Sequence, residues 1–257
     1  MIERDHLKAY LFLILTTLCW GLNAIISRLA VGEIAPMQLV TFRWLGVVLL
    51  LFFVARKRMI EDWPVLRQHL PYLGLMGAFG FTVFNALFYA AGHHTTAINI
   101  GILQGSIPIF VFIGSFLFFR HKMSLIQVVG VIITLIGVIV VTIAGDFAQL
   151  SSLSINRGDF FMLVACLFYA GYSVGLSRKP QVSAMALFGV LAISAWLVSI
   201  PLAVIEASQI GWQSPTLTGW ILVVLVALLP SFVSQIFFIT KNQTNPQPQN
   251  FYFPKNP

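Results

Sequence analysis

Eight apolar segments, each about 20 residues long, restrict what this sequence can fold into. A helix of about 20 apolar residues crosses the hydrocarbon core of a bilayer, which is about 30 Å thick. Only 9% of the 257 residues are charged, too few to cover the surface of a soluble domain of this length. We therefore expect an all-α, polytopic bundle of membrane helices. The segments lie at residues 10–30, 36–55, 70–91, 97–119, 124–144, 159–177, 183–205 and 217–240.

The basic residues between these segments predict the orientation of the chain. With the N-terminus in the cytoplasm, 12 of the 15 Lys and Arg lie on the cytoplasmic side, two lie outside and one, Arg43, lies within a segment. Cytoplasmic loops of membrane proteins carry an excess of Lys and Arg, so we expect a cytoplasmic N-terminus. Because the net charge of +7 arises in these loops, it does not indicate nucleic-acid binding.

An internal repeat is visible when the chain is aligned with itself at an offset of 150 residues. WGLNAIISR at 20–28 then meets AGYSVGLSR at 170–178, the second apolar segment meets the seventh, and the third meets the eighth. Five helices per repeat is an odd number, so the second copy would be inverted in the membrane, as in many secondary transporters. We expect a first repeat at 1–146, an incomplete second repeat of three helices at 147–240, and a polar, disordered tail at 241–257.

Three stretches resemble the EamA-type domain of the drug/metabolite transporter superfamily. They are CWGLNAIISRLAV, PMQLVTFRWLGVVLLLF and the long stretch at 88–141, and the resemblance covers about residues 10–240. It implies a ten-helix bundle of two inverted five-helix repeats in the cell (inner) membrane. It also implies the export of amino acids or related small metabolites. On this pattern the chain is truncated after the eighth helix, which we expect to impair transport.

Arg43 is the one cation in the interior of an apolar segment, because Arg28 lies at the outer end of the first segment. A charged group in a membrane is costly and is by default a candidate for a functional site. Arg43 could hold the carboxylate of an amino-acid-like solute through bidentate hydrogen bonds. The favoured interpretation is structural: the side chain extends to the outer surface, or it bonds backbone carbonyls of a neighbouring helix.

The uncharged candidates for a solute site each carry an amide, hydroxyl or indole group. Each one either lines a central cavity suited to neutral or zwitterionic solutes, or bonds an adjacent helix. Asn85 and Tyr89 are four residues apart and therefore share a helix face. The full set is Trp20, Asn23, Asn85, Tyr89, Gln104, Tyr169, Ser173 and Gln235.

Motifs for catalysis, metal binding or nucleotide binding are not found in the sequence, so we predict no enzyme activity, metal or cofactor. His93 and His94 lie at the outer end of the third segment without acidic or Cys partners, and are interpreted as interface residues. The leading hypothesis is a secondary transporter that exports its solute by alternating access. The alternative is a non-transporting assembly or receptor-like subunit. The expected partners are a small solute and the lipid bilayer, and a homodimer is left open.

Overall fold

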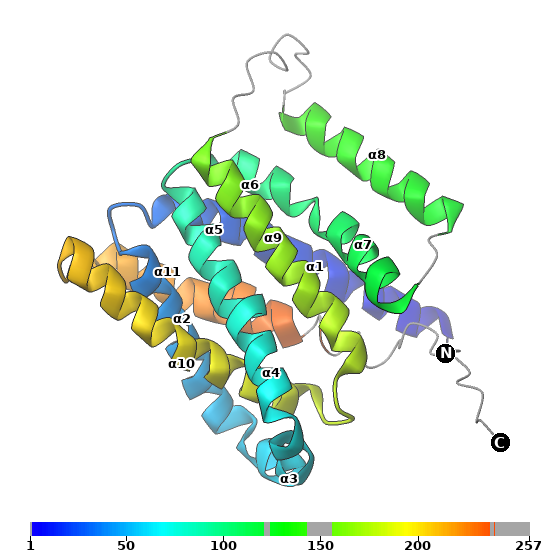
Figure 1. The fold of residues 1–257 in the computed structure, drawn as a ribbon, viewed down its shortest axis with the longest axis horizontal. Helices are drawn as coiled ribbons and strands as arrows, with labels where there is room; N and C mark the ends of the chain where they lie inside the picture. Colours follow the sequence, from blue (N-terminus) through cyan, green and yellow to red (C-terminus); the bar gives the residue numbers. More distant parts are fainter. Residues whose placement is uncertain (1, 121–123, 143–155, 237–238, 240–257) are drawn as a thin grey trace.

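The computed structural model describes residues 2–120, 124–142, 156–236 and 239, and within them it is an all-α bundle without strands (Figure 1). The expected tail at 241–257 lies outside the described residues. The α-helices are α1 (Ile2–Leu29), α2 (Pro36–Val54), α3 (Arg56–Leu66), α4 (Leu70–Gly77), α5 (Phe84–Gly92), α6 (Ala97–Gln104), α7 (Ile107–Phe119), α8 (Leu125–Thr142), α9 (Arg157–Gly175), α10 (Ala184–Ile210) and α11 (Leu217–Val226).

Each predicted apolar segment is helical where the structure describes it. Six helical stretches among the described residues are long and apolar enough to cross a membrane. They contain the second, third, fourth, sixth, seventh and eighth segments, while Ile14–Leu29 forms a shorter apolar helix and α8 contains 18 residues. The chain is therefore a multi-pass membrane protein. The six stretches are Pro36–Val54, Arg56–Gly92, Ala97–Phe119, Arg157–Arg178, Ala184–Ile210 and Leu217–Ile236.

Local sequence accounts for most of the helix starts. Prolines occupy the first turn of α2, α4 and α7, where the missing N–H has no intrahelical partner to lose. Asn156 begins α9 with a capping box, in which its side chain accepts from the Asp159 N–H and the Asp159 carboxylate accepts from the Asn156 N–H. Ser183 and Thr216 cap α10 and α11 with their hydroxyl groups, which accept from the N–H groups of Ala186 and Gly219.

Two of the membrane helices contain a π-helical segment, in which the backbone is locally underwound. One is η2 (Ala78–Val83), between α4 and α5, and the other is η5 (Ala227–Val233), which follows α11. The repeat offset of 150 residues places 78–83 over 228–233. The two π-helical segments also pack against corresponding helices. The segment η2 contacts α10, and η5 contacts α2, which the offset aligns with α10. These matches support the predicted inverted repeat.

The connection between the second and third apolar segments, for which the sequence indicated no element, is the helix α3. It lies at one end of the bundle, below α2 and α10 in the view of Figure 1. Most of its charged residues are exposed, as are Ile60 and Trp63, which are 64% and 46% exposed. A helix that exposes both apolar and charged side chains, and that follows directly on a membrane helix, is suited to the membrane interface.

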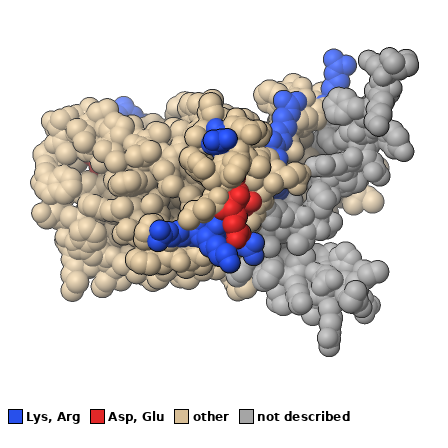
Figure 2. Space-filling view, turned by 90° about the horizontal axis from the view of Figure 1, so that it is seen from below, with Lys and Arg blue, Asp and Glu red and all other residues tan. Residues whose placement is uncertain are grey.

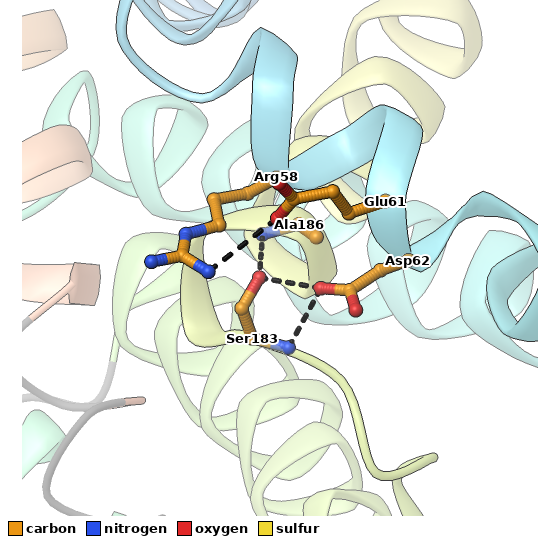
Figure 3. Close-up of polar contacts among 5 residues, drawn as sticks. All are labelled: Arg58, Glu61, Asp62, Ser183 and Ala186. Atoms are coloured by element: carbon orange, nitrogen blue, oxygen red, sulfur yellow. Dashed lines mark hydrogen bonds and ion pairs between the residues drawn. The ribbon is translucent and has the colours of Figure 1, made fainter.

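Two carboxylates join the opposite ends of α10 to its neighbours, one to α3 and one to α2. In α3, the Asp62 carboxylate accepts hydrogen bonds from the Ser183 N–H (2.9 Å) and hydroxyl (2.6 Å) at the start of α10 (Figure 3). Near the other end, the Glu206 carboxylate of α10 accepts from the Met37 and Gln38 N–H groups in the first turn of α2. Each acid thus satisfies free N–H groups at a helix N-terminus and complements the helix dipole.

Candidate functional site

The candidate site is built around Arg43, eight residues into α2. Its Nε donates to the Ser231 hydroxyl of η5 at 2.6 Å. Its Nη1 donates to Asn85 Oδ1 at 2.6 Å and to the Tyr89 hydroxyl at 2.7 Å, both on α5. Asn23 Oδ1 of α1 lies 3.5 Å from Nη1 and accepts from the Tyr89 hydroxyl at 2.8 Å. One guanidinium therefore joins helices from four separate regions of the chain.

The favoured prediction for Arg43, that its side chain extends to the outer surface or bonds backbone carbonyls, is wrong. The side chain is only 3% exposed, so it does not extend to the surface. Its hydrogen bonds also go to side-chain oxygens of Asn85, Tyr89 and Ser231 rather than to backbone carbonyls. The cause is tertiary: α5 and η5 bring their polar residues to the depth of Arg43, which makes burial of the cation less costly than it is on an isolated helix.

The charge of Arg43 has no acidic partner in the described part of the chain. The ion pair found there joins Arg58 and Glu61 on the outside of α3. The oxygens around Arg43 belong to neutral amide and hydroxyl groups, which stabilise the cation through dipoles only. In addition, no hydrogen bond of Arg43 Nη2 is found among the described residues. The site thus holds a net positive charge with two N–H donors still available.

A narrow cavity adjoins this guanidinium. Only about 20 Å³ of it is wide enough for water, roughly the space of one or two molecules. Aromatic rings enclose it: Trp20 and Tyr169 meet edge to face at 5.5 Å, and Trp44 stacks on Phe81 at 4.7 Å. Its walls are Trp20, Asn23, Arg43, Trp44, Gly80, Phe81, Phe84, Asn85, Gln104, Ile107, Tyr169, Pro230 and Gln235.

The structure brings seven of the nine predicted site residues to this cavity wall, namely Trp20, Asn23, Arg43, Asn85, Gln104, Tyr169 and Gln235. Tyr89 supports Arg43 through its hydroxyl without lining the cavity. Ser173 is half-buried on α9 and is not brought to the wall. The sequence prediction omitted Trp44 and Ser231. A signal for Ser231 existed, because it is a polar residue next to Pro230 within an apolar segment.

Two residues of the cavity wall each carry a buried polar atom with no hydrogen-bond partner among the described residues, namely Trp44 Nε1 and Gln235 Oε1. Trp44 is 1% exposed and Gln235 is 5% exposed, so neither atom is compensated by bulk water. Buried polar groups are almost always paired, and an unpaired one costs about 1–3 kcal/mol. An unused donor and an unused acceptor in one cavity indicate space for a ligand or water with both kinds of group.

The histidines outside this cavity do not form a second polar centre. Burial, and after it the neighbouring His94 and Arg28, lowers the pKa of His93, which keeps its imidazole neutral near pH 7. His94 packs edge to face against Phe161 at 5.9 Å. Within the described residues, no group of three or more His, Cys, Asp or Glu side chains is close enough to hold a metal ion.

Comparison with known proteins gives a consistent result. A model of the EamA-like transporter family matches residues 7–143. The chain is 27% identical over 177 residues to YyaM, an uncharacterized transporter of Bacillus subtilis, a match that covers 68% of this chain and 57% of YyaM. It is 24% identical over 243 residues to YetK, an uncharacterized transporter of the same organism, covering 93% of this chain and 72% of YetK.

A solved crystal structure shares the fold. It superposes with a TM-score of 0.64 at 18% sequence identity, and the match covers 91% of this chain and 79% of the other. At this identity the likeness concerns the arrangement of helices alone.

Proposed function

The chain belongs to the EamA-like transporter family, and from that premise we propose that it is a secondary transporter for a small solute with a carboxylate. The observation that carries the proposal is Arg43, a buried cation with available N–H donors, no acidic partner among the described residues, and a cavity beside it. A carboxylate would neutralise this charge and accept two parallel hydrogen bonds from the guanidinium. The solute would thus supply the anion that the described part of the chain does not place beside Arg43.

The remaining walls of the cavity favour a zwitterionic solute, such as an amino acid. Trp44 Nε1 is an unpaired donor next in sequence to Arg43, which suits a second carboxylate oxygen. Gln235 Oε1 is an unpaired acceptor, which suits an ammonium group. Rings of Trp20, Phe84 and Tyr169 would surround an apolar side chain. Amino acids or related metabolites therefore remain the substrate class that we propose.

Transport through this cavity requires a change of conformation. The water-sized space of about 20 Å³ is too small for an amino acid, so solute entry must separate the walls. The π-helical segments η2 and η5 both contribute to the wall, through Gly80 and Phe81 in η2 and through Pro230 in η5. Underwound segments and proline are places where membrane helices bend. We propose alternating access with bending at these two segments, and export as its direction.

Ligand-dependent thermal unfolding of the purified chain tests the carboxylate. Each amino acid is compared with the amine that lacks only its carboxylate, for example phenylalanine with phenethylamine. We expect the acids to raise the unfolding midpoint and the amines to leave it unchanged, since a ligand that binds only the folded state stabilises it. The Arg43→Gln variant should lose the shift. Equal stabilisation by acids and amines would contradict the proposed role of Arg43.

Transport itself is tested by counterflow of a stabilising amino acid in proteoliposomes. Greater accumulation of labelled solute in proteoliposomes than in protein-free vesicles supports the proposed transporter. Binding without any counterflow would instead favour the alternative from the sequence, a non-transporting subunit with a solute site.

A further inference from the structure

A second cavity lies outside the Arg43 site, between the end of α2, α3 and the first half of α10. Its volume is about 340 Å³. Two features make it a built groove: α3 turns back beside α2, and Gly189 of α10 lets Met59 of α3 approach closely. A Cβ at position 189 would come within 2.6 Å of Met59 Sδ. The lining residues are Val48, Leu51, Phe52, Arg56, Met59, Ile60, Trp63, Gly189 and Ile193.

The groove combines an almost wholly apolar wall with one cation at its edge. Arg56 is the only charged residue among those that line it. Its guanidinium lies 5.6 Å from the Phe52 ring, and no hydrogen bond or ion pair of Arg56 is found among the described residues. Lys57 follows directly and is exposed. The exposed guanidinium of Arg56 therefore lies at the edge of an apolar space, without an acceptor among the described residues.

The location of the groove decides what can fill it. Val48, Leu51 and Phe52 belong to the last turns of a membrane helix, and α3 follows at the membrane interface. On the face seen from below, Asp and Glu side chains lie in one cluster together with Lys and Arg side chains (Figure 2). On the orientation indicated by the basic loops, the end of the bundle at which α3 lies is cytoplasmic. Water is unfavourable in so large an apolar space, and acyl chains are the apolar molecules present at this depth.

We propose that this groove binds an anionic phospholipid of the cytoplasmic leaflet, with one acyl chain against Trp63 and Ile193 and the phosphate at Arg56. Arg suits this contact because its planar guanidinium can bond two phosphate oxygens at once. A basic pocket between membrane helices on the cytoplasmic side is the arrangement expected for anionic headgroups. The site is independent of the solute proposed for Arg43.

The proposal is tested with lipids that carry bromine on their acyl chains, because bromine quenches tryptophan fluorescence on contact. The purified chain is placed in vesicles of unlabelled phosphatidylcholine that contain a small fraction of brominated phosphatidylglycerol or brominated phosphatidylcholine. The Trp63→Phe variant isolates the Trp63 signal by subtraction. We expect the phosphatidylglycerol probe to quench Trp63 at least about threefold more efficiently than the phosphatidylcholine probe.

Two charge-matched variants decide whether Arg56 is responsible. Arg56→Gln should remove the preference for phosphatidylglycerol, whereas Lys57→Gln, which loses the same charge outside the groove, should keep most of it. Equal quenching by both lipids in the wild type would overturn the proposal. An equal loss in both variants would also overturn it, because it would indicate general attraction to a negative surface. Protection of Trp63 from both probes, with dimers seen by cross-linking, would assign the groove to a second copy of the chain instead.

Discussion

Two helix crossings that correspond at the repeat offset of 150 residues differ in their chemistry. In one, α10 crosses α4 and η2; in the other, α2 crosses η5. At the α10 crossing the contacts are uncharged: the Thr82 hydroxyl donates to the Ala195 carbonyl at 2.7 Å and the Ser194 hydroxyl to the Gly74 carbonyl at 2.7 Å. At the α2 crossing the contact is a buried cation, Arg43, on the Ser231 hydroxyl.

This difference between a charged and an uncharged crossing distinguishes the contacts that hold the fold from the residues of the candidate site. Because one crossing packs with small residues and hydroxyl-to-carbonyl bonds, the architecture does not depend on a buried charge. The repeat offset of 150 places Arg43 opposite Ile193, so the cation is present on one side only. A buried charge that the corresponding helix contact does without is consistent with the solute binding that we propose for Arg43.

The largest expected effect comes from removing the charge at the α2 crossing. Arg43→Gln should lower counterflow of a carboxylate solute about 10–100-fold, because a hydrogen bond to a charged group contributes about 1.5–3 kcal/mol. The matched variant at the other crossing, Thr82→Val, should leave transport within about twofold and lower stability by about 1 kcal/mol. Comparable transport losses in the two variants would remove the distinction between the crossings.

The next effect concerns the close approach at the α10 crossing. A Cβ on Gly77 would lie 2.5 Å from the Leu191 carbonyl oxygen and 2.9 Å from Ser194 Cβ. Gly77→Ala should therefore lower the free energy of unfolding by about 1–3 kcal/mol, the usual cost of overpacking. Gly46→Ala at the α2 crossing meets only Ala227 Cβ, at 3.2 Å, and should cost less. Thermal unfolding in detergent compares the two, and the reverse order would show that the α2 crossing is the tighter one.

A smaller effect is expected from the hydroxyl that positions Arg43. Ser231→Ala removes the acceptor of Arg43 Nε and should lower transport about 5–10-fold, equivalent to about 1–1.4 kcal/mol. Ser234 is a suitable control on the same helix, because its buried hydroxyl donates to the Pro230 carbonyl and does not contact Arg43. Ser234→Ala should transport normally. A rise in KM with unchanged kcat for Ser231→Ala would assign it to solute binding.

The smallest effect is expected at the two carboxylates that join the ends of α10 to α3 and α2, Asp62 and Glu206. Asp62→Asn and Glu206→Gln keep an acceptor oxygen and lose the charge at a helix N-terminus, which stabilises by about 0.3–1 kcal/mol. We expect each variant to lower the unfolding midpoint slightly. The double variant should show the sum of the two decreases, because the two sites lie at opposite ends of α10. A double variant much less stable than that sum would mean that the two ends are coupled.

Most of the candidate site could be predicted because polar residues are rare in apolar segments. That rule was enough to select Asn85, Gln104 and Gln235, all of which line the cavity. It also selected Ser173, which is not at the wall, because composition does not indicate which helix face points inward. Trp44 was omitted because an aromatic residue in an apolar segment is usually a packing residue. Its place at the cavity depends on neighbours that only the fold reveals.

The α3 helix illustrates the same limit in the fold. Its charged residues and Pro64 resemble a connecting loop, and its short length gives too few turns for a clear helical period. The helix packs against α10, and its Asp62 carboxylate accepts two hydrogen bonds from Ser183, 121 residues later in the chain. The groove beside it could not be predicted, because its walls come from distant parts of the chain.

The sequence by itself determined that this chain crosses a membrane and where its helices lie. Lipid offers no partners for backbone N–H and C=O groups, so every apolar segment of sufficient length must satisfy them internally as a helix. Only the tertiary structure decided where the Arg43 side chain lies and what it contacts. Whether a cation reaches the surface or is buried depends on where the side chains of other helices lie, and Asn85 and Ser231 are 42 and 188 residues away in the chain.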